Sequence, residues 1–419
     1  MDRPVTYAVV GAGDRGTGYA NWIAGHPERA RVVAVAEPRD LQRTELARRH
    51  DIPPERAFRS WQELAAAPRL ADAAIVATQD SDHVGPAITL ADNGYHLVVE
   101  KPLAPTEQEC AELVRAVVDA GVLFAVCHVL RYRPYTRLVK SLIDEGRLGE
   151  VMSVQHLEPV GHWHYAHSYV RGNWRRADLA SFMLLAKSGH DIDWLRHLVG
   201  RPVERVASFG SLRHFRRESQ PAGASDRCLT CAVEPDCPYS ATRLYLDLVR
   251  AGRTGWPITV LTDDPTEDGV RAALADGPYG RCVYACDNDV VDHQVVALEF
   301  GGGVTATFTM AAFTPHMDRR TQIFGTRGSL DGDGERVTLH EFTTGETTEL
   351  TVPGGGQDAG DGHGGGDAGL LAAFTSAVAT GDDGHILSGP HESLQSHLAV
   401  FAAERARLSG TVEPVAPAG

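Results

Sequence analysis

The chain has 419 residues, of which 43% are hydrophobic and 23% are charged, and its formal net charge is −15. A chain of this length exceeds one ordinary hydrophobic core, so we expect two domains. The acidic balance argues against nucleic acid as the main partner, and no apolar run reaches the roughly eighteen residues that a membrane span requires.

The N-terminal segment and the cysteines indicate a compartment. The sequence enters an apolar strand directly after MDRP, so we expect no signal peptide. The chain has seven cysteines, an odd number, which is typical of reduced thiols. We therefore expect a cytoplasmic protein.

Residues 5–16, VTYAVVGAGDRG, join an apolar strand to a glycine-rich turn, and TGYANWIAG continues at helical period. Gly11 permits a tight turn, Gly13 lets the backbone approach a pyrophosphate, and Gly16 lets the helix pack closely on the strand. The pattern predicts a dinucleotide-binding site whose loop includes Asp14 and Arg15. The alternative is a plain βαβ unit without a ligand.

The second strand ends in a residue that is expected to select the cofactor. The segment RVVAVAEPRD places Glu37 about 20 residues beyond the last glycine. A carboxylate at this place can bind the ribose hydroxyls and repels a 2′-phosphate, so NAD is favoured. Arg39 lies close by and keeps NADP as an alternative.

Strands and helices alternate up to about residue 128. Residues 71–78 (ADAAIVAT), 95–103 (YHLVVEKPL) and 122–130 (VLFAVCHVL) predict strands, and residues 107–121 predict an amphipathic helix. The alternation predicts an α/β Rossmann domain with a doubly wound parallel sheet over residues 1–128. Ligands bind at the carboxyl ends of such strands. The side chains expected there are Thr78, His83, Glu100 and Lys101.

Three motifs together resemble the Gfo/Idh/MocA family: GAGDRG, the tripeptide EKP at 100–102 and HDIDWLRHLVG at 190–200. The resemblance covers nearly the whole chain. It implies that residues 129–419 form a C-terminal α+β domain with an open, mainly antiparallel sheet. It also implies NAD(P)-dependent oxidation or reduction of one carbinol of a sugar, aminosugar or cyclitol. Open sheets of this family commonly pack face to face, so we expect a homo-oligomer, a dimer or a tetramer. Further segments that resemble the family lie at 128–151, 323–330, 363–374 and 396–408.

The family's catalytic lysine and histidine match Lys101 and His190. A histidine at a helix start is kept neutral by the helix dipole and can act as a base, and a lysine can stabilise a developing alkoxide. Family members often carry an aspartate four residues before the histidine, but this chain has Ala186 there, next to Lys187. Lys187 is therefore included among the predicted catalytic residues, with Asp191 or Asp193 as other substitutes. The alternative is that LAKSGHDIDW is only the polar start of a helix.

Residues 150–176 mix histidine, tryptophan, tyrosine and arginine. Polar and aromatic groups together suit a sugar, and the alternative is a surface loop. A metal is not expected at this place, because hydride transfer does not require one. The residues predicted to bind the substrate are Arg131, Glu158, His164, His167, Arg171, Trp174 and Asp191, with His156 and His162 as further candidates.

Residues 227–247, RCLTCAVEPDCPYSATRLYLD, contain three closely spaced cysteines. The spacing of Cys228, Cys231 and Cys237 is typical of a zinc site, and either Cys282 or Cys286 would be the fourth ligand. An iron–sulfur site, a redox pair and buried free thiols are the alternatives. The segment lies in a predicted insertion at about 205–282, which is expected to shape the cleft or to cover a subunit interface.

Two later segments have simpler interpretations. Residues 287–313 alternate strongly and predict central strands with a hairpin at GGG. Residues 353–367 are glycine-rich and predict a flexible loop, and no chemistry is assigned to His363.

Three functions follow from these patterns. The first is an NAD(P)-dependent dehydrogenase or reductase for a sugar or cyclitol substrate. The second, also present in the resembled family, is a glycosidase that keeps NAD bound, oxidises C3, eliminates the aglycone and reduces again, with a base from residues 156–176. The third is a non-enzymatic NAD-binding regulator, which the missing aspartate at position 186 would suit.

Overall fold

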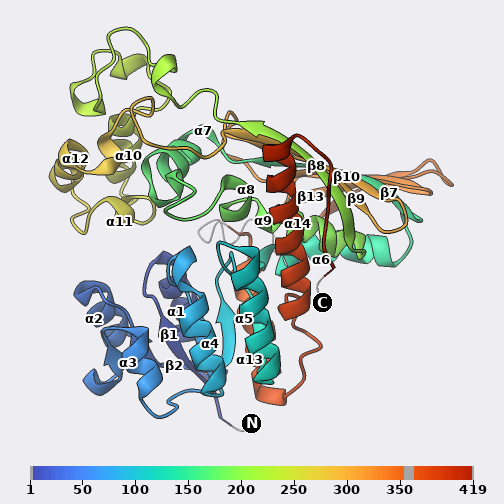
Figure 1. Ribbon diagram of the computed structural model, residues 1–419, viewed down its shortest axis with the longest axis horizontal. Helices are drawn as coiled ribbons and strands as arrows, with labels where there is room; N and C mark the ends of the chain where they lie inside the picture. The colour runs from blue at the N-terminus through green and yellow to red at the C-terminus, as the bar shows by residue number, and fades with distance from the viewer. Residues whose placement is uncertain (1–2, 353–362, 418–419) are drawn as a thin grey trace.

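The computed structural model of the chain describes residues 3–352 and 363–417, and it contains two sheets (Figure 1). The predicted glycine-rich loop at 353–367 lies mostly outside the described residues. In the described ranges, none of the helices is both long and apolar enough to cross a membrane.

The N-terminal sheet is parallel, with the strand order β3-β2-β1-β4-β5-β6. Because β1 lies between β2 and β4, the carboxyl ends of β1 and β4 meet where the strand order reverses, which is where such sheets bind ligands. The predicted doubly wound sheet is confirmed. Its strands are β1 (Val5–Val10), β2 (Ala30–Ala36), β3 (Ala57–Phe58), β4 (Ala73–Val76), β5 (His96–Val99) and β6 (Phe124–Val126). Its helices are α1 (Asp14–Ala24), α2 (Asp40–Arg49), α3 (Trp61–Ala66), α4 (Val84–Asp92) and α5 (Glu107–Asp119).

The second sheet is mixed and mainly antiparallel, with the order β14-β13-β12-β11-β7-β10-β9-β8-β15. Only β7 and β10 pair in parallel among the described strands of this sheet. The predicted hairpin at GGG is present between β9 and β10, where Gly302 and Gly303 have positive φ angles that favour glycine. The strands are β7 (Val151–Pro159), β8 (Val203–Ser211), β9 (His293–Phe300), β10 (Thr305–Ala311), β11 (Arg320–Gly325), β12 (Gly328–Gly332), β13 (Arg336–Glu341), β14 (Thr347–Thr351) and β15 (Glu413–Pro414).

Helices at the two ends of the second domain join it to the first. α6 (Pro134–Asp144) follows the Rossmann sheet, and α9 (Gly189–Val199) packs on β7 and β10. α13 (Gly366–Thr380) returns to the Rossmann sheet, where the Thr375 hydroxyl lies 2.8 Å from that of Tyr7 on β1. α14 (Pro390–Ser409) contacts both α5 and β8. Late segments of the chain therefore hold the two sheets together.

A long connection, residues 212–292, joins the neighbouring strands β8 and β9. A hairpin needs only a few residues, so this segment is a separate structural unit. It carries α10 (Ala241–Arg250), α11 (Ile258–Leu261) and α12 (Glu267–Asp276), which lie together at one side of the molecule (Figure 1). These helices share a small core of their own, which includes Tyr245, Ile258 and Leu274. The predicted insertion at 205–282 overlaps this connection.

A buried ion pair ties the start of the second domain to α9 and α14. Arg131, in the turn after β6, donates from Nε and Nη2 to both carboxylate oxygens of Asp193, at 2.8 and 2.7 Å. Ser396 on α14 donates to the same carboxylate at 2.7 Å. Burial favours a higher pKa for Asp193, but the charges of Arg131 and His128 and the hydrogen bonds from Arg131 and Ser396 together outweigh burial and hold the pKa well below its ordinary value.

The first prediction concerns this ion pair. Replacing Asp193 by alanine leaves the buried Arg131 guanidinium with only the exposed Glu392 carboxylate, 3.9 Å away, so the free energy of unfolding should fall by about 3–5 kcal/mol in denaturant titrations. The carboxylate contributes stability above its unfolded pKa of about 4, and this contribution is lost as the pH falls through the depressed folded value. Asp193→Asn should therefore weaken the acid dependence of stability as well. An unchanged denaturation midpoint for both variants would contradict the assignment.

Candidate active site and cofactor cradle

The glycine-rich turn has one open side. A Cβ atom on Gly11, whose φ is +92°, would collide with the Ala77 carbonyl, and one on Gly16 would collide with the Gly11 carbonyl. In contrast, the nearest atom to a Cβ on Gly13 is Arg39 Nη2 at 3.8 Å. Two glycines are thus required by packing, and the third leaves the backbone at the start of α1 approachable. This arrangement fits the pyrophosphate of a dinucleotide.

Glu37 and Arg39 form one unit at the end of β2. The buried Glu37 carboxylate accepts hydrogen bonds from the Ala12 amide at 2.8 Å and from Arg39 Nε and Nη2 at 2.8 and 3.0 Å. Burial favours a higher pKa for Glu37, but its hydrogen bonds with Arg39 lower the pKa overall, so the carboxylate is ionised. The side chains that favour NAD and NADP therefore contact each other.

Other residues predicted to bind the cofactor hold the turn in place. Arg15 Nε donates to Glu100 at 2.6 Å, and the Tyr19 hydroxyl donates to the same oxygen at 2.7 Å. Arg15 also pairs with Asp367 on α13. The link from Glu100 to α1 and α13 fixes the EKP turn that carries Lys101.

His83 and Thr78 lie at the end of β4 and help to shape this edge of the sheet. His83 is buried, and its Nδ1 lies 2.6 Å from the Pro102 carbonyl of the EKP turn. The Thr78 hydroxyl donates to the Asp82 carbonyl at 2.9 Å. Both residues therefore shape the edge through backbone contacts, and their role with a cofactor stays a prediction.

Lys101 and His190 come together between the two domains. Lys101 Nζ donates at 2.6 Å to the carbonyl of Ala186, the last residue of α8 (Met183–Ala186). Burial lowers the pKa of His190 well below its ordinary value, and the charge of Lys101 adds to this effect. Its Nδ1 is buried and has no hydrogen-bond partner among residues 3–352 and 363–417. His190 is therefore a neutral imidazole with an unused nitrogen.

Two further histidines lie close to His190. The ring centroid of His363 is 5.6 Å from that of His190, and His128 is at 6.3 Å. His363 Nδ1 lies 3.0 Å from Asp367, which also pairs with Arg15. Sequence patterns assigned no chemistry to His363. This residue comes close to His190 because α13, which follows it, returns to the Rossmann domain.

A chain of alternating charges leads away from Lys187. Lys187 Nζ lies 3.3 Å from Glu158 Oε1 on β7, and Arg319 Nη2 lies 2.8 Å from Glu158 Oε2. Arg319 also pairs with Asp191, which lies 3.0 Å from His156 Nε2. Glu158 is therefore the carboxylate that contacts Lys187, the residue next to Ala186. Sequence patterns did not identify Arg319, because it lies in an irregular segment before β11.

Aromatic rings form a wall beside Lys187. The ring of His164 lies 5.2 Å from Trp256, 5.7 Å from Trp163 and 5.8 Å from His316. Burial lowers the pKa of His164 well below its ordinary value, and the Lys187 charge lowers it further. Trp256 belongs to the connection between β8 and β9, so this connection contributes to the site.

His167 joins the same wall from the other side. Its ring faces Trp256 at 5.2 Å and stacks on Tyr279 at 4.8 Å, and its Nδ1 lies 2.8 Å from the Tyr245 hydroxyl. Burial lowers its pKa to about 3, so it is neutral. Both tyrosines and Trp256 come from the connection, and no sequence motif marked them.

Three predicted substrate contacts have their polar atoms or rings directed elsewhere. Arg131 pairs with Asp193 in the core. Arg171 donates to the carbonyls of Arg281 and Tyr239 beside the cysteine segment. Trp174 is half-buried, with its ring 6.3 Å from that of Tyr169. Their contact with a substrate remains a prediction.

The connection also reaches the cofactor turn. Burial raises the pKa of Asp14 at the start of α1, and a hydrogen bond with the Thr259 side chain on α11 opposes this effect. Asp263, just after α11, adds negative charge near Arg39. The connection therefore lies against both ends of the predicted site.

The predicted zinc ligands line one small cavity of about 20 Å³. All seven cysteines are free thiols. In the described parts of the chain, no group of three or more His, Cys, Asp or Glu side chains is arranged to hold a metal ion. The geometry as it stands therefore does not support the zinc prediction. The cysteines that line the cavity are Cys228, Cys231, Cys237 and Cys282.

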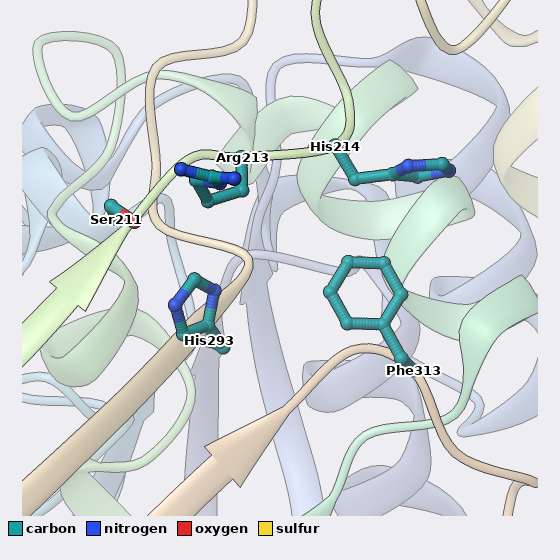
Figure 2. A pocket seen from close by; sticks show the side chains of 5 residues that line it. All are labelled: Ser211, Arg213, His214, His293 and Phe313. Atoms are coloured by element: carbon teal, nitrogen blue, oxygen red, sulfur yellow. The ribbon is translucent and has the colours of Figure 1, made fainter. Parts of the chain in front are cut away.

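A larger hollow lies elsewhere. A groove of about 700 Å³ is open to solvent where β8, β9 and β10 meet the long connection (Figure 2). The ring of Phe313 lies edge-on to that of His214 at 5.5 Å. None of the residues predicted to bind cofactor or substrate lines this groove. Its lining residues are Ser211, Arg213, His214, His293 and Phe313.

Comparison with known families agrees with this geometry. Residues 5–128 match the family described as "Oxidoreductase family, NAD-binding Rossmann fold", and residues 140–366 match "Oxidoreductase family, C-terminal alpha/beta domain". The chain belongs to the Gfo/Idh/MocA oxidoreductase family. The resemblance inferred from the three motifs is thereby confirmed.

Curated relatives within the family have diverse names. The chain is 26% identical over 268 residues to "Putative oxidoreductase YteT" of Bacillus subtilis, covering 62% of this chain and 60% of that protein. It is 30% identical over 283 residues to "2,7-anhydro-N-acetylneuraminate hydratase" of Mediterraneibacter gnavus, covering 65% of this chain and 68% of that protein. The match to the Bacillus protein thus spans less than two thirds of its length.

A solved structure shares the fold of this chain over nearly its whole length. A levoglucosan dehydrogenase in complex with NADH superposes with a TM-score of 0.73 at 19% identity, covering 99% of this chain and 100% of the other. At this identity the likeness shows the fold alone. The shared fold therefore extends over nearly the whole length of both chains.

The second prediction concerns the choice of cofactor. Wild-type protein should bind NAD more tightly than NADP, because the ionised Glu37 repels a 2′-phosphate. Glu37→Gln should narrow the difference in affinity between NAD and NADP, because it removes the charge of the side chain and keeps its shape. Arg39→Gln should weaken the binding of NADP further. Fluorescence titration with both nucleotides measures this. Equal or tighter NADP binding by the wild type would show that Arg39 dominates.

Proposed function

We propose that the protein is an NAD(P)-dependent oxidoreductase that acts on a carbinol of a sugar, aminosugar or cyclitol. The observation that carries the proposal is the buried, neutral His190 beside Lys101, between the dinucleotide-binding sheet and the second domain. NAD is the favoured cofactor, because Glu37 is ionised at the end of β2.

The residues divide the proton chemistry between them. When bound, the nicotinamide would accept or supply the hydride at the substrate carbon. His190 takes the proton of the substrate hydroxyl as the carbon is oxidised, and returns it in the reverse direction. The Lys101 ammonium donates to the same oxygen and stabilises its developing negative charge. Ala186 holds Lys101 Nζ through its carbonyl, so the lysine is oriented before the substrate binds.

Lys187 has a different place in this proposal. Its ammonium group is paired with Glu158, and both lie beside His164 and the aromatic wall. A sugar offers hydroxyl groups and an apolar face, which match charged groups beside aromatic rings. We assign Lys187 and Glu158 to the hydroxyl groups next to the reacting carbon.

The third prediction tests the catalytic pair. His190→Ala should lower kcat by about 10²–10⁴, the usual cost of removing a general base, with NAD affinity nearly unchanged. Lys101→Ala should also lower kcat, and Lys187→Ala should raise KM more than it lowers kcat. Steady-state kinetics on the substrate identified by a sugar and cyclitol screen measures these effects. Normal turnover of both main variants would move the chemistry to the histidines of residues 156–167.

A second function is favoured by the additional acid–base groups. His164, Glu158 and Lys187 form a set of proton-transfer groups separate from Lys101 and His190. Transient oxidation of a carbinol acidifies the proton on the neighbouring carbon, and a neutral His164 can remove it. Elimination of the neighbouring substituent, addition of water to the resulting alkene and re-reduction of the carbonyl, with the hydride that the bound cofactor would return, then leave no net oxidation. The relative from Mediterraneibacter gnavus is named as a hydratase.

The fourth prediction separates these two functions. A dehydrogenase releases one reduced cofactor per product, whereas an elimination cycle forms product without accumulating NADH. We expect NADH absorbance to rise with product when a sugar or cyclitol is supplied with excess NAD. Product formation with catalytic amounts of NAD and a flat absorbance would instead assign the elimination cycle. In that case His164→Ala should abolish product while a partial reduction of bound NAD persists.

Assembly and location complete the proposal. Phe209, Val295 and Phe324 are exposed on the face of the second sheet opposite α9, and Phe209 pairs with Val295 in the strand register. Large exposed apolar residues on an open sheet suit a contact between subunits. We therefore propose a homo-oligomer.

The free cysteines are the basis for proposing a reducing, cytoplasmic location.

A further inference from the structure

We propose that Cys228, Cys231, Cys237 and Cys282 bind a structural zinc ion inside the connection between β8 and β9. The four thiols line one cavity but are not arranged as a metal site in the described residues, so zinc binding requires them to rearrange around the ion. The backbone gathers these residues around a cavity of ionic size, and a buried arginine beside the cavity has an unbalanced charge.

The backbone brings the distant cysteine to the cluster. Arg227 and Arg281 form an antiparallel bridge, and the Cys282 amide donates to the Asp226 carbonyl at 2.9 Å. Cys228 and Cys282 are therefore next to one another on paired segments. The Cys231 amide donates to the Cys228 carbonyl at 3.2 Å, which closes the C-x-x-C segment into a tight turn. Such a turn is typical of the first half of a zinc knuckle.

The cavity between these segments has the size of an ion site. Its volume of about 20 Å³ exceeds the roughly 10–15 Å³ that one water molecule requires, and it is too small for an organic ligand. Apolar side chains, including Val233 and Val283, complete its lining. Four thiolates in a tetrahedral arrangement are the usual ligands of structural zinc.

Arg171 supplies an independent observation. This arginine is 1% exposed, and its Nε and Nη2 donate to the carbonyls of Arg281 and Tyr239, each at 2.8 Å. Nη2 also lies 3.6 Å from Cys228 Sγ. Its Nη1 is buried without a hydrogen-bond partner in the described residues, and no carboxylate there lies within ion-pair distance of the guanidinium.

A buried guanidinium without an anion is strongly unfavourable. Zinc binding by four thiols releases four protons and leaves a centre with a net charge of about −2, counted from one divalent ion and four thiolates. The positive charge of Arg171 would then face a negative centre. Free thiols provide no such charge, so the position of Arg171 favours the metal-bound state over four protonated cysteines.

The structure also distinguishes between the two predicted fourth ligands. Cys282 lines the cavity, whereas Cys286 does not and donates its thiol proton to the Cys282 carbonyl at 3.3 Å. Cys286 is therefore a matched control, because it lies in the same segment. The zinc ion would hold in place the connection that carries Trp256 and Thr259. An effect of the ion on catalysis through these two residues rests on the proposed function, whereas zinc binding itself does not.

The fifth prediction is tested by metal analysis of full-length protein purified under reducing conditions without chelator. We expect about one zinc ion per chain in the wild type and in Cys286→Ser. Cys228→Ser and Cys237→Ser should lose most of the zinc. After removal of zinc, cobalt titration of the wild type should give the intense absorption of thiolate–cobalt charge transfer, and the Cys286→Ser protein should do the same.

Other results would overturn the proposal. Metal-free wild-type protein that takes up neither zinc nor cobalt would show buried free thiols, and iron with acid-labile sulfide would show an iron–sulfur cluster. A disulfide found by mass mapping of the reduced preparation would also exclude the site. If the cysteine variants do not fold, the cobalt titration of the wild type still decides. Zinc found in protein that lacks the proposed oxidoreductase activity would leave this site intact and reject only the function.

Discussion

The position of His190 depends on the two carboxylates that follow it on α9. Asp191 pairs with Arg319 and lies against His156 of the second sheet, whereas Asp193 pairs with Arg131 at the exit of the Rossmann domain. Residues two apart on a helix point in nearly opposite directions. One short helix is therefore held on both sides by buried charges. A buried pair of this kind tolerates little displacement, because either partner alone would be costly.

Electrostatics around the site follow from the same arrangement. Lys101, Arg319 and Lys187 surround the histidines with positive charge, and burial acts in the same direction on the pKa values of His190 and His164. Both imidazoles are consequently neutral at physiological pH. Neutral bases beside fixed cations suit the removal of a hydroxyl proton, since the oxygen gains negative charge as the proton leaves.

The long connection between β8 and β9 contributes residues to both ends of the predicted site. It supplies Trp256 to the aromatic wall and places Thr259 beside Asp14 of the cofactor turn. Apolar side chains of the connection form a small core of their own. Because the connection contacts both the aromatic wall and the cofactor turn, its rigidity affects the predicted binding sites of both substrate and cofactor. The cysteine cavity lies within this segment, beside Arg171.

Local sequence determined much of this protein. GAGDRG, Glu37 and the alternation of strands and helices specify the Rossmann sheet, because turn geometry and hydrophobic period act over a few residues. EKP and HDIDW indicated Lys101 and His190 through resemblance to the family. In contrast, Arg319, His363 and Trp256 approach the predicted site from segments that are distant in sequence, and no local pattern assigned them to it. Arg131, which was predicted to bind the substrate, forms a core ion pair with Asp193 that no local pattern indicated. Only the tertiary structure decides such positions, because long-range packing sets which side chains share a buried charge.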